Sequence, residues 1–166
     1  MKISLVGYMA SGKTLVGKAL AEQLKLPFID LDQEIEKAIG SSISDLISAK
    51  NELYFRKIER EHLKRVLQQP SFVLSCGGGT PCYYSNMEDI NAESMSFYLQ
   101  ETPKTLAARL MADRKNRPLI ERIEEKDLFE FVAKHVFDRR PYYEMANYSV
   151  RGDDKVEQIV NLVNVH

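Results

Sequence analysis

Gly7-Tyr8-Met9-Ala10-Ser11-Gly12-Lys13-Thr14 matches the pattern G-x-x-x-x-G-K-[ST] at every fixed position. The stretch follows an apolar run at residues 3–6 and opens a helical pattern, which is the context that this motif requires. Its glycines let backbone N–H groups turn toward an anion, and the helix N-terminus adds a favourable dipole. Lys13 would reach the β- and γ-phosphates, and the Thr14 hydroxyl would coordinate Mg²⁺. The stretch therefore predicts a site for a nucleoside triphosphate.

Apolar runs of strand length alternate with longer helical patterns on both sides of this loop. Strands are expected at residues 2–6, 27–30, 72–75, 95–99 and 148–151. Helices are expected near residues 13–25, 32–38, 43–67, 103–112, 126–145 and 154–164. This alternation predicts an α/β fold with a five-stranded parallel sheet flanked by helices on both faces. Ligands of such folds bind beyond the carboxyl ends of the strands, so we expect the chemistry there.

The length and charge of the chain exclude several classes of protein. Its 166 residues suit one domain, and 23 Lys and Arg balance 24 Asp and Glu, for a formal net charge of −1. A nucleic-acid binder or a polybasic membrane-surface protein needs a basic surplus. The apolar runs are too short to span a bilayer, and the first strand begins at once, leaving no room for a signal peptide. We expect a single cytoplasmic domain over residues 1–166, with no nucleic-acid or membrane partner.

The cysteines and histidines do not form a metal-binding pattern. Two cysteines, Cys76 and Cys82, are too few for a four-ligand zinc site, and the three histidines are scattered along the chain. A disulfide between the two cysteines is disfavoured in a reducing cytosol. We expect both thiols to be reduced.

Residues 113–126 interrupt the alternation of strands and helices. The segment is mostly charged and contains Pro118. A solvated loop would account for this composition. Alternatively, the segment is a mobile lid that closes over phosphates, as is common in phosphoryl-transfer enzymes.

Two carboxylates stand at the expected end of the second strand. Asp30 and Asp32 are two residues apart, so in an extended segment both side chains would point to the same side. One could hold Mg²⁺, directly or through water, and the other could accept a proton from a substrate hydroxyl. The alternative is that one of them only caps the helix that begins near Gln33.

Arginines and a glycine run indicate a second ligand. Glu52 and Glu59 are spaced for helical ion pairs with Arg56, which on a surface are worth only about a few tenths of a kcal/mol. The run at residues 77–79 suits close approach of a ligand to the backbone, or else forms a permissive turn. Arg56 and Arg139 could together hold a carboxylate through bidentate contacts.

These landmarks, taken in order, resemble the shikimate kinase family over nearly the whole chain. They are Gly7–Thr14, Phe28-x-Asp30-x-Asp32 with Ile35-Glu36, Phe55-Arg56-x-x-Glu59, Gly77-Gly78-Gly79, Arg117-Pro118-Leu119 and Arg139-x-Pro141-x-Tyr143. The resemblance implies a P-loop kinase fold with a mobile lid at about residues 113–126, acting as a monomer. It implies transfer of the γ-phosphoryl group of ATP, with Mg²⁺, to the 3-hydroxyl of shikimate, a step of aromatic amino-acid biosynthesis.

The resemblance also implies roles for individual residues. Asp32 would bind the shikimate hydroxyls and act as the base, and Lys13 and Arg117 would complete the catalytic set. The metal would be held by Thr14 and Asp30. The shikimate site would comprise Asp32, Arg56, Gly77, Gly78, Gly79 and Arg139. The nucleotide site would comprise Gly7, Ala10, Ser11, Gly12, Lys13, Thr14, Leu15, Arg109 and Arg117.

The chain departs from the family pattern at a few positions. Ala10 stands where the family often has glycine, and Leu15 follows Thr14, but neither change removes a group that holds phosphate. Arg109, which resembles the arginine that stacks on adenine, is one residue off its usual spacing to Arg117. The segment 151–154 matches poorly, so no adenine contact is assigned there.

Two other functions are compatible with the phosphate loop. One is gluconate kinase or another small P-loop metabolite kinase. The paired arginines and the glycine run favour a compact carboxylated polyol over a nucleoside monophosphate. The other is a catalytically inactive nucleotide-binding module, against which the retained lysine, threonine, two aspartates and lid arginine argue.

Overall fold

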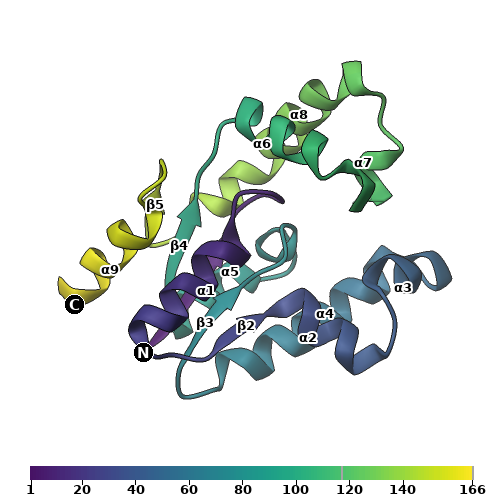
Figure 1. The fold of residues 1–166 in the computed structure, drawn as a ribbon. Coiled ribbons are helices and arrows are strands. Elements are labelled where there is room, and N and C mark those ends of the chain that lie inside the picture. Colours follow the sequence, from purple (N-terminus) through teal and green to yellow (C-terminus); the bar gives the residue numbers. More distant parts are fainter. Residues whose placement is uncertain (117, 166) are drawn as a thin grey trace.

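Five parallel strands form the central sheet of this computed structural model (Figure 1). The structure describes residues 1–116 and 118–165, and of residues 116, 118 and 119 it describes the backbone alone. The strands are β1 (Lys2–Val6), β2 (Phe28–Asp30), β3 (Phe72–Ser75), β4 (Met95–Leu99) and β5 (Tyr148–Val150). Their order is β2-β3-β1-β4-β5, and all four pairings are parallel. The predicted five-stranded parallel sheet is confirmed, with strand bounds that differ by at most one residue at either end.

Helices cover both faces of the sheet. On one face, α1 (Lys13–Leu24) and α9 (Lys155–Val165) enclose a core that includes Ile3, Leu5, Leu20 and Ile159, all fully buried. The other face carries α2 (Leu31–Ile39), α3 (Ile43–Ala49), α4 (Glu52–Leu67), α5 (Asn86–Glu93), α6 (Pro103–Ala112) and α8 (Glu125–Tyr143). Short helical turns lie at η1 (Thr80–Cys82), η2 (Arg114–Asn116) and α7 (Pro118–Glu121).

The order of the strands places the phosphate loop near the middle of the sheet. β1 lies between β3 and β4, so the loops that follow these three strands leave the same edge. Figure 1 shows α2, α3 and α4 as one group and α6, α7 and α8 as another. Because ligands of parallel α/β sheets bind beyond the carboxyl ends of the strands, this edge is where the candidate residues should meet.

The longer helices differ from the sequence prediction in two places. The single helix expected at 43–67 is two helices, because Lys50 leaves helical geometry and the extended Asn51 caps α4, accepting a hydrogen bond from Tyr54 N at 2.8 Å. Asparagine is a favoured N-cap residue. The helix α5 was not predicted. None of the helices among the described residues is both long and apolar enough to cross a membrane.

Candidate active site

The loop between β1 and α1 adopts the backbone conformations of an anion cradle. Gly7, Ala10 and Gly12 have φ angles of 147°, 63° and 93°. A Cβ atom at Gly7 would lie 2.9 Å from the carbonyl oxygen of Leu99, so only glycine fits there. Ala10 takes a left-handed conformation that costs an L-residue about 1–2 kcal/mol. The loop thus holds one L-residue in a strained conformation between two glycines of positive φ.

Two side chains of the loop fit it to phosphate. The Lys13 ammonium donates to the carbonyl oxygens of Gly7 at 2.8 Å and Tyr8 at 2.9 Å, and it is largely buried. Ser11 Oγ is buried and has no hydrogen-bond partner among the described residues. A buried hydroxyl without a partner costs about 1–3 kcal/mol. A phosphate oxygen in the cradle would supply that partner, so the residues present fit a bound nucleotide.

Thr14 and Asp30 meet at the start of α1 and the end of β2. Thr14 Oγ1 donates to Asp30 Oδ2 at 3.0 Å, while Asp30 Oδ1 accepts from Gln33 N at 3.3 Å and caps α2. The capping alternative therefore accounts for one oxygen of Asp30 but not for the other. No cluster of three or more metal-binding side chains exists in the part of the chain that the structure describes. Mg²⁺ in kinases usually takes one or two protein oxygens plus phosphate and water, so this pair fits it.

Asp32 lies in the first turn of α2, not in an extended segment. β2 ends at Asp30 and α2 begins at Leu31, so the prediction that alternation along a strand aligns the two carboxylates is wrong. The helix turn nonetheless brings both into one cleft of about 420 Å³, which Lys13 and Thr14 also line. The two carboxylates therefore converge, through a strand end and a helix start.

The surroundings of Asp32 resist its ionisation. Burial raises the pKa of this carboxyl to about 6, and the neighbouring carboxylates of Glu59 and Asp30 act in the same direction. The cations Lys13 and Arg56 oppose the shift without cancelling it. A carboxylate with a pKa near the working pH is suited to accept a proton from a substrate hydroxyl.

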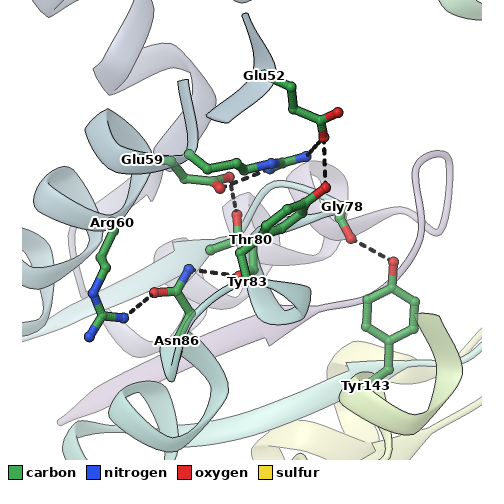
Figure 2. Close-up of polar contacts among 9 residues, drawn as sticks. Glu52, Glu59, Arg60, Gly78, Thr80, Tyr83, Asn86 and Tyr143 are labelled. Carbon is green, nitrogen blue, oxygen red and sulfur yellow. Dashed lines mark hydrogen bonds and ion pairs between the residues drawn. The ribbon is translucent and has the colours of Figure 1, made fainter. Parts of the chain in front are cut away.

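Arg56 is buried in a network of side chains from α4 and the loop after β3. Its Nη1 lies 2.8 Å from Glu59 Oε2 and its Nη2 lies 3.2 Å from Glu52 Oε1. The fully buried Glu59 also accepts from Thr80 Oγ1 at 2.6 Å, and the Tyr83 ring stacks 4.2 Å from the guanidinium (Figure 2). The surface-ion-pair interpretation is therefore wrong for Arg56 and Glu59, because both are buried.

Two glycines of the 77–79 run make room for site side chains. A Cβ atom at Gly77 would lie 2.8 Å from Asp32 Oδ1. A Cβ atom at Gly79 would lie 2.5 Å from Arg56 Nη2. Both distances are closer than a real Cβ contact, so the permissive-turn alternative does not account for the run. The glycines let the carboxylate and the guanidinium approach one backbone segment.

One face of α8 reaches the same loop and the phosphate loop. Gly78 accepts a hydrogen bond from Tyr143 Oη at 2.6 Å, and its Cβ position lies 3.5 Å from Arg139 Nη1. Tyr8 Oη lies 2.9 Å from His135 Nδ1, and the Arg139 guanidinium lies 5.9 Å from the centre of the Tyr8 ring. Burial and Arg139 lower the pKa of His135 to about 4, which keeps the imidazole neutral. Spacing by four residues aligns the three α8 side chains.

Arg56 and Arg139 influence the same neighbouring groups. Burial raises the pKa of the Cys82 thiol to about 11, and both guanidinium groups oppose that shift. The pKa of Glu52 is lowered, first by its hydrogen bond from Tyr83 and also by the two arginines. The predicted pair of arginines is thus brought to one region beside the glycine run. Both cysteines of the chain are free thiols, as expected.

Arg109 and Leu15 border the phosphate loop on its other side. Arg109 Nη1 donates to the carbonyl oxygen of Ala10 at 3.0 Å, and its Nη2 lies 3.3 Å from Glu101 Oε1. A cleft of about 350 Å³ is lined by both residues and by Gly152 and Asp153. The segment 151–154, to which the sequence analysis assigned no adenine contact, therefore adjoins this cleft. Arg117, assigned to catalysis and to the nucleotide, lies outside the described residues.

Several residues outside the predicted site hold it together. Asn86 Nδ2 donates to the Thr80 carbonyl at 2.8 Å, and Arg60 Nη1 donates to Asn86 Oδ1 at 2.8 Å (Figure 2). Tyr83 Oη donates to Glu52 Oε1 at 2.7 Å. These contacts join residues 20 or more positions apart or lie inside an irregular loop, so no local pattern signals them. Glu52 and Glu59 are different, because their i,i+4 and i,i+3 spacings to Arg56 are visible in the sequence.

Comparison with known proteins identifies the family. A family model described as shikimate kinase matches residues 9–164. The chain belongs to the shikimate kinase family. A shikimate kinase from Flavobacterium psychrophilum is 44% identical over 156 residues, covering 93% of this chain and 91% of the relative. A shikimate kinase from Bacteroides fragilis is 36% identical over 175 residues, covering 100% of this chain and 98% of the relative.

Solved shikimate kinases share the fold. The crystal structure of the enzyme from Bacteroides thetaiotaomicron has a TM-score of 0.91 and 34% identity, covering 99% of this chain and 97% of that one. The enzyme from Acinetobacter baumannii, solved with shikimate, has a TM-score of 0.90 and 31% identity, covering 99% and 93%. A gluconokinase from Sinorhizobium meliloti, at 0.55 and 20%, shares only the fold. The P-loop kinase fold is confirmed, and the chain is a kinase that uses ATP with Mg²⁺.

Proposed function

We propose that the chain transfers the γ-phosphoryl group of ATP to the 3-hydroxyl of shikimate, releasing ADP and shikimate 3-phosphate. The observation that carries this proposal is the meeting of Asp32, Arg56 and Arg139 at one glycine run beside the phosphate loop. Two guanidinium groups suit a carboxylate, and an aspartate suits a hydroxyl. A gluconate-type polyol also carries a carboxylate, but the family membership favours shikimate.

The chemical step needs a proton acceptor and a fixed substrate. Arg56 and Arg139 would hold the carboxylate, and the backbone of residues 77–79 would line the ring's position. Asp32 would then accept the proton of the attacking hydroxyl while ionised. Because phosphoryl transfer depends mainly on positioning and charge stabilisation, the buried contacts of Arg56 with Glu59 are part of the machinery.

The phosphate side of the reaction falls to the loop and its neighbours. Lys13 and the inward backbone N–H groups would hold the β- and γ-phosphates. Thr14 and Asp30 would hold Mg²⁺, which neutralises phosphate charge when bound. Arg109 and Leu15 would border the nucleotide. Arg117, from its place in the family pattern, would stabilise charge on the transferred group.

Residues 113–126 would act as a lid of this single domain, which spans residues 1–166. Asp113 lines the cleft that contains Asp30 and Asp32, and Ile120 is buried. The Arg114 side chain donates to the carbonyl oxygens of Glu121 and Ile123, which ties the segment into one unit. Closure of such a unit would exclude water from the phosphates. The proposal includes a monomer that acts in the cytoplasm. The balanced charge of the chain supports the absence of a nucleic-acid partner.

A coupled assay of ADP release tests the proposal. The purified chain receives Mg²⁺ and ATP together with shikimate, gluconate or a nucleoside monophosphate in separate reactions. Release of ADP with shikimate alone is the expected result. Activity with gluconate instead would assign the second metabolite, and ATP binding without turnover on any substrate would indicate a binding module. Asp32→Asn serves as the inactive control, because contaminating kinases would not respond to that change.

A further inference from the structure

A second large cleft lies between β4, α6 and α8, apart from the proposed catalytic residues. Its volume is about 520 Å³, within the range of on the order of 300–1,000 Å³ that small-molecule sites occupy. Its lining combines the apolar side chains of Pro103, Val136 and Phe137 with the polar and basic side chains of Tyr98, Arg140 and Arg151. It shares Gly152 with the cleft beside Arg109 but none of the residues proposed to bind shikimate.

Tyr98 supplies an unpaired polar group in the wall of this cleft. The residue is only 3% exposed, and its ring lies 5.2 Å from that of Tyr143. Its hydroxyl donates to no acceptor, and accepts from no donor, within the described part of the chain. The ring is buried, whereas the hydroxyl is open to the cleft. A ligand acceptor in the cleft would supply the partner that the protein does not.

Arg140 and Arg151 bring guanidinium groups to the cleft, and Glu144 balances the charge of Arg140. Arg140 and Arg151 are each engaged through Nε, with Glu144 at 2.6 Å and Gln100 at 2.7 Å. Their Nη groups make no hydrogen bond to the described residues and are left for a ligand. The carboxylate of Glu101, which also lines the cleft, is neutralised by Lys155 at 2.6 Å and by Arg109 at 3.3 Å. The ten-residue helix α6 begins at Pro103 in the lining of this cleft, and its dipole also favours an anion.

We propose that this cleft is a binding site for a small organic anion, a monocarboxylate on an apolar ring. The carboxylate would accept hydrogen bonds from the Tyr98 hydroxyl and from the Nη groups of Arg140 and Arg151. The ring would pack against Val136 and Phe137. Phe137 is 76% exposed in the free chain. The ligand would contact the helix that carries Arg139 but not the shikimate site. Both ligands can therefore bind at once.

The test uses the full chain and 4-fluorophenylacetate, followed by fluorine NMR. Saturable binding is expected, and it should persist when shikimate and Mg-ADP are added in excess. Tyr98→Phe and Arg151→Gln should each weaken binding by about tenfold, the effect of losing a hydrogen bond to a charged group. The uncharged probe 4-fluorobenzyl alcohol should bind about tenfold more weakly than the acid. Arg65→Gln, on the exposed side of α4, is the matched control and should change nothing.

Two results would overturn the proposal. Unchanged affinity in both Tyr98→Phe and Arg151→Gln would show that these polar side chains do not hold the anion. Displacement of the probe by shikimate or by the nucleotide would place it in the catalytic cleft instead. Tyr98→Phe should keep the Tm of the unmodified chain, since the hydroxyl makes no internal hydrogen bond. Arg151 is exposed, so Arg151→Gln tests the charge without disturbing the core.

Discussion

The environment of the Asp32 carboxyl group determines both its reactivity and its effect on the stability of the fold. Burial and two nearby carboxylates raise its pKa to about 6. If the ionised form accepts the hydroxyl proton, kcat/KM for shikimate should fall about tenfold per pH unit below 6. Asp32→Asn should lower kcat by at least about a hundredfold and leave ATP affinity nearly unchanged. A pH–rate profile and a nucleotide titration measure these effects, and an unchanged kcat would remove the assignment.

Protonation of Asp32, which should lower activity, should raise the stability of the fold. Its pKa is higher in the folded chain than the ordinary 3.8, so the ionised form destabilises the fold above about pH 6. Stability should therefore rise as pH falls from about 6 to about 4, where the folded chain takes up the proton first. Asp32→Asn should raise the free energy of unfolding at pH 8 by about 1–3 kcal/mol. Urea unfolding at pH 8 and pH 5 checks this, and a loss at pH 8 would contradict it.

The two glutamates that pair with Arg56 differ in burial, so their contributions to stability should differ. Glu59 is fully buried, whereas the Glu52 side chain is 52% exposed. Glu59→Gln leaves a buried guanidinium with too little compensation and should cost about 3 kcal/mol of unfolding free energy. Glu52→Gln should cost under about 1 kcal/mol, since exposed ion pairs contribute little. Denaturant unfolding of the two variants gives the comparison, and equal losses would show that burial does not decide it.

At the scale of elements, α8 links the two halves of the site. His135 contacts the phosphate loop through Tyr8, and Tyr143 donates to the Gly78 carbonyl at 2.6 Å. Tyr143→Phe removes that buried hydrogen bond and should destabilise the chain by about 1–2 kcal/mol. It should also raise KM for shikimate more than KM for ATP, because Gly78 lies beside Arg139. Steady-state kinetics test this against Tyr142→Phe, an exposed neighbour that should behave like the unmodified chain.

The elements also show which features of the structure can be predicted from the sequence. The sheet and the phosphate loop are local patterns, so they were predicted almost to the residue. The break at Asn51 was missed because the apolar periodicity continues across it, although the asparagine is itself a capping signal. The joining of Asp30 and Asp32 was expected for the wrong reason, since a helix start rather than a strand aligns them. The Tyr8–His135 contact spans 127 residues, and no single-sequence pattern carries it.

At the scale of the whole molecule, the lid proposal predicts a change that depends on both substrates. Apart from Ile120, the residues of the 113–126 segment whose side chains are described are exposed or half-buried, so the backbone amides of this segment should exchange readily in the free chain. Binding of shikimate with a non-hydrolysable ATP analogue should protect them, because closure excludes water from the phosphates. Hydrogen exchange read by mass spectrometry measures this, with α9 as the internal control because it packs on the far face of the sheet.

Complete protection of the segment in the free chain would contradict a lid. Protection by the nucleotide alone would mean that closure does not wait for the second substrate, and ATP would then be exposed to hydrolysis in its absence.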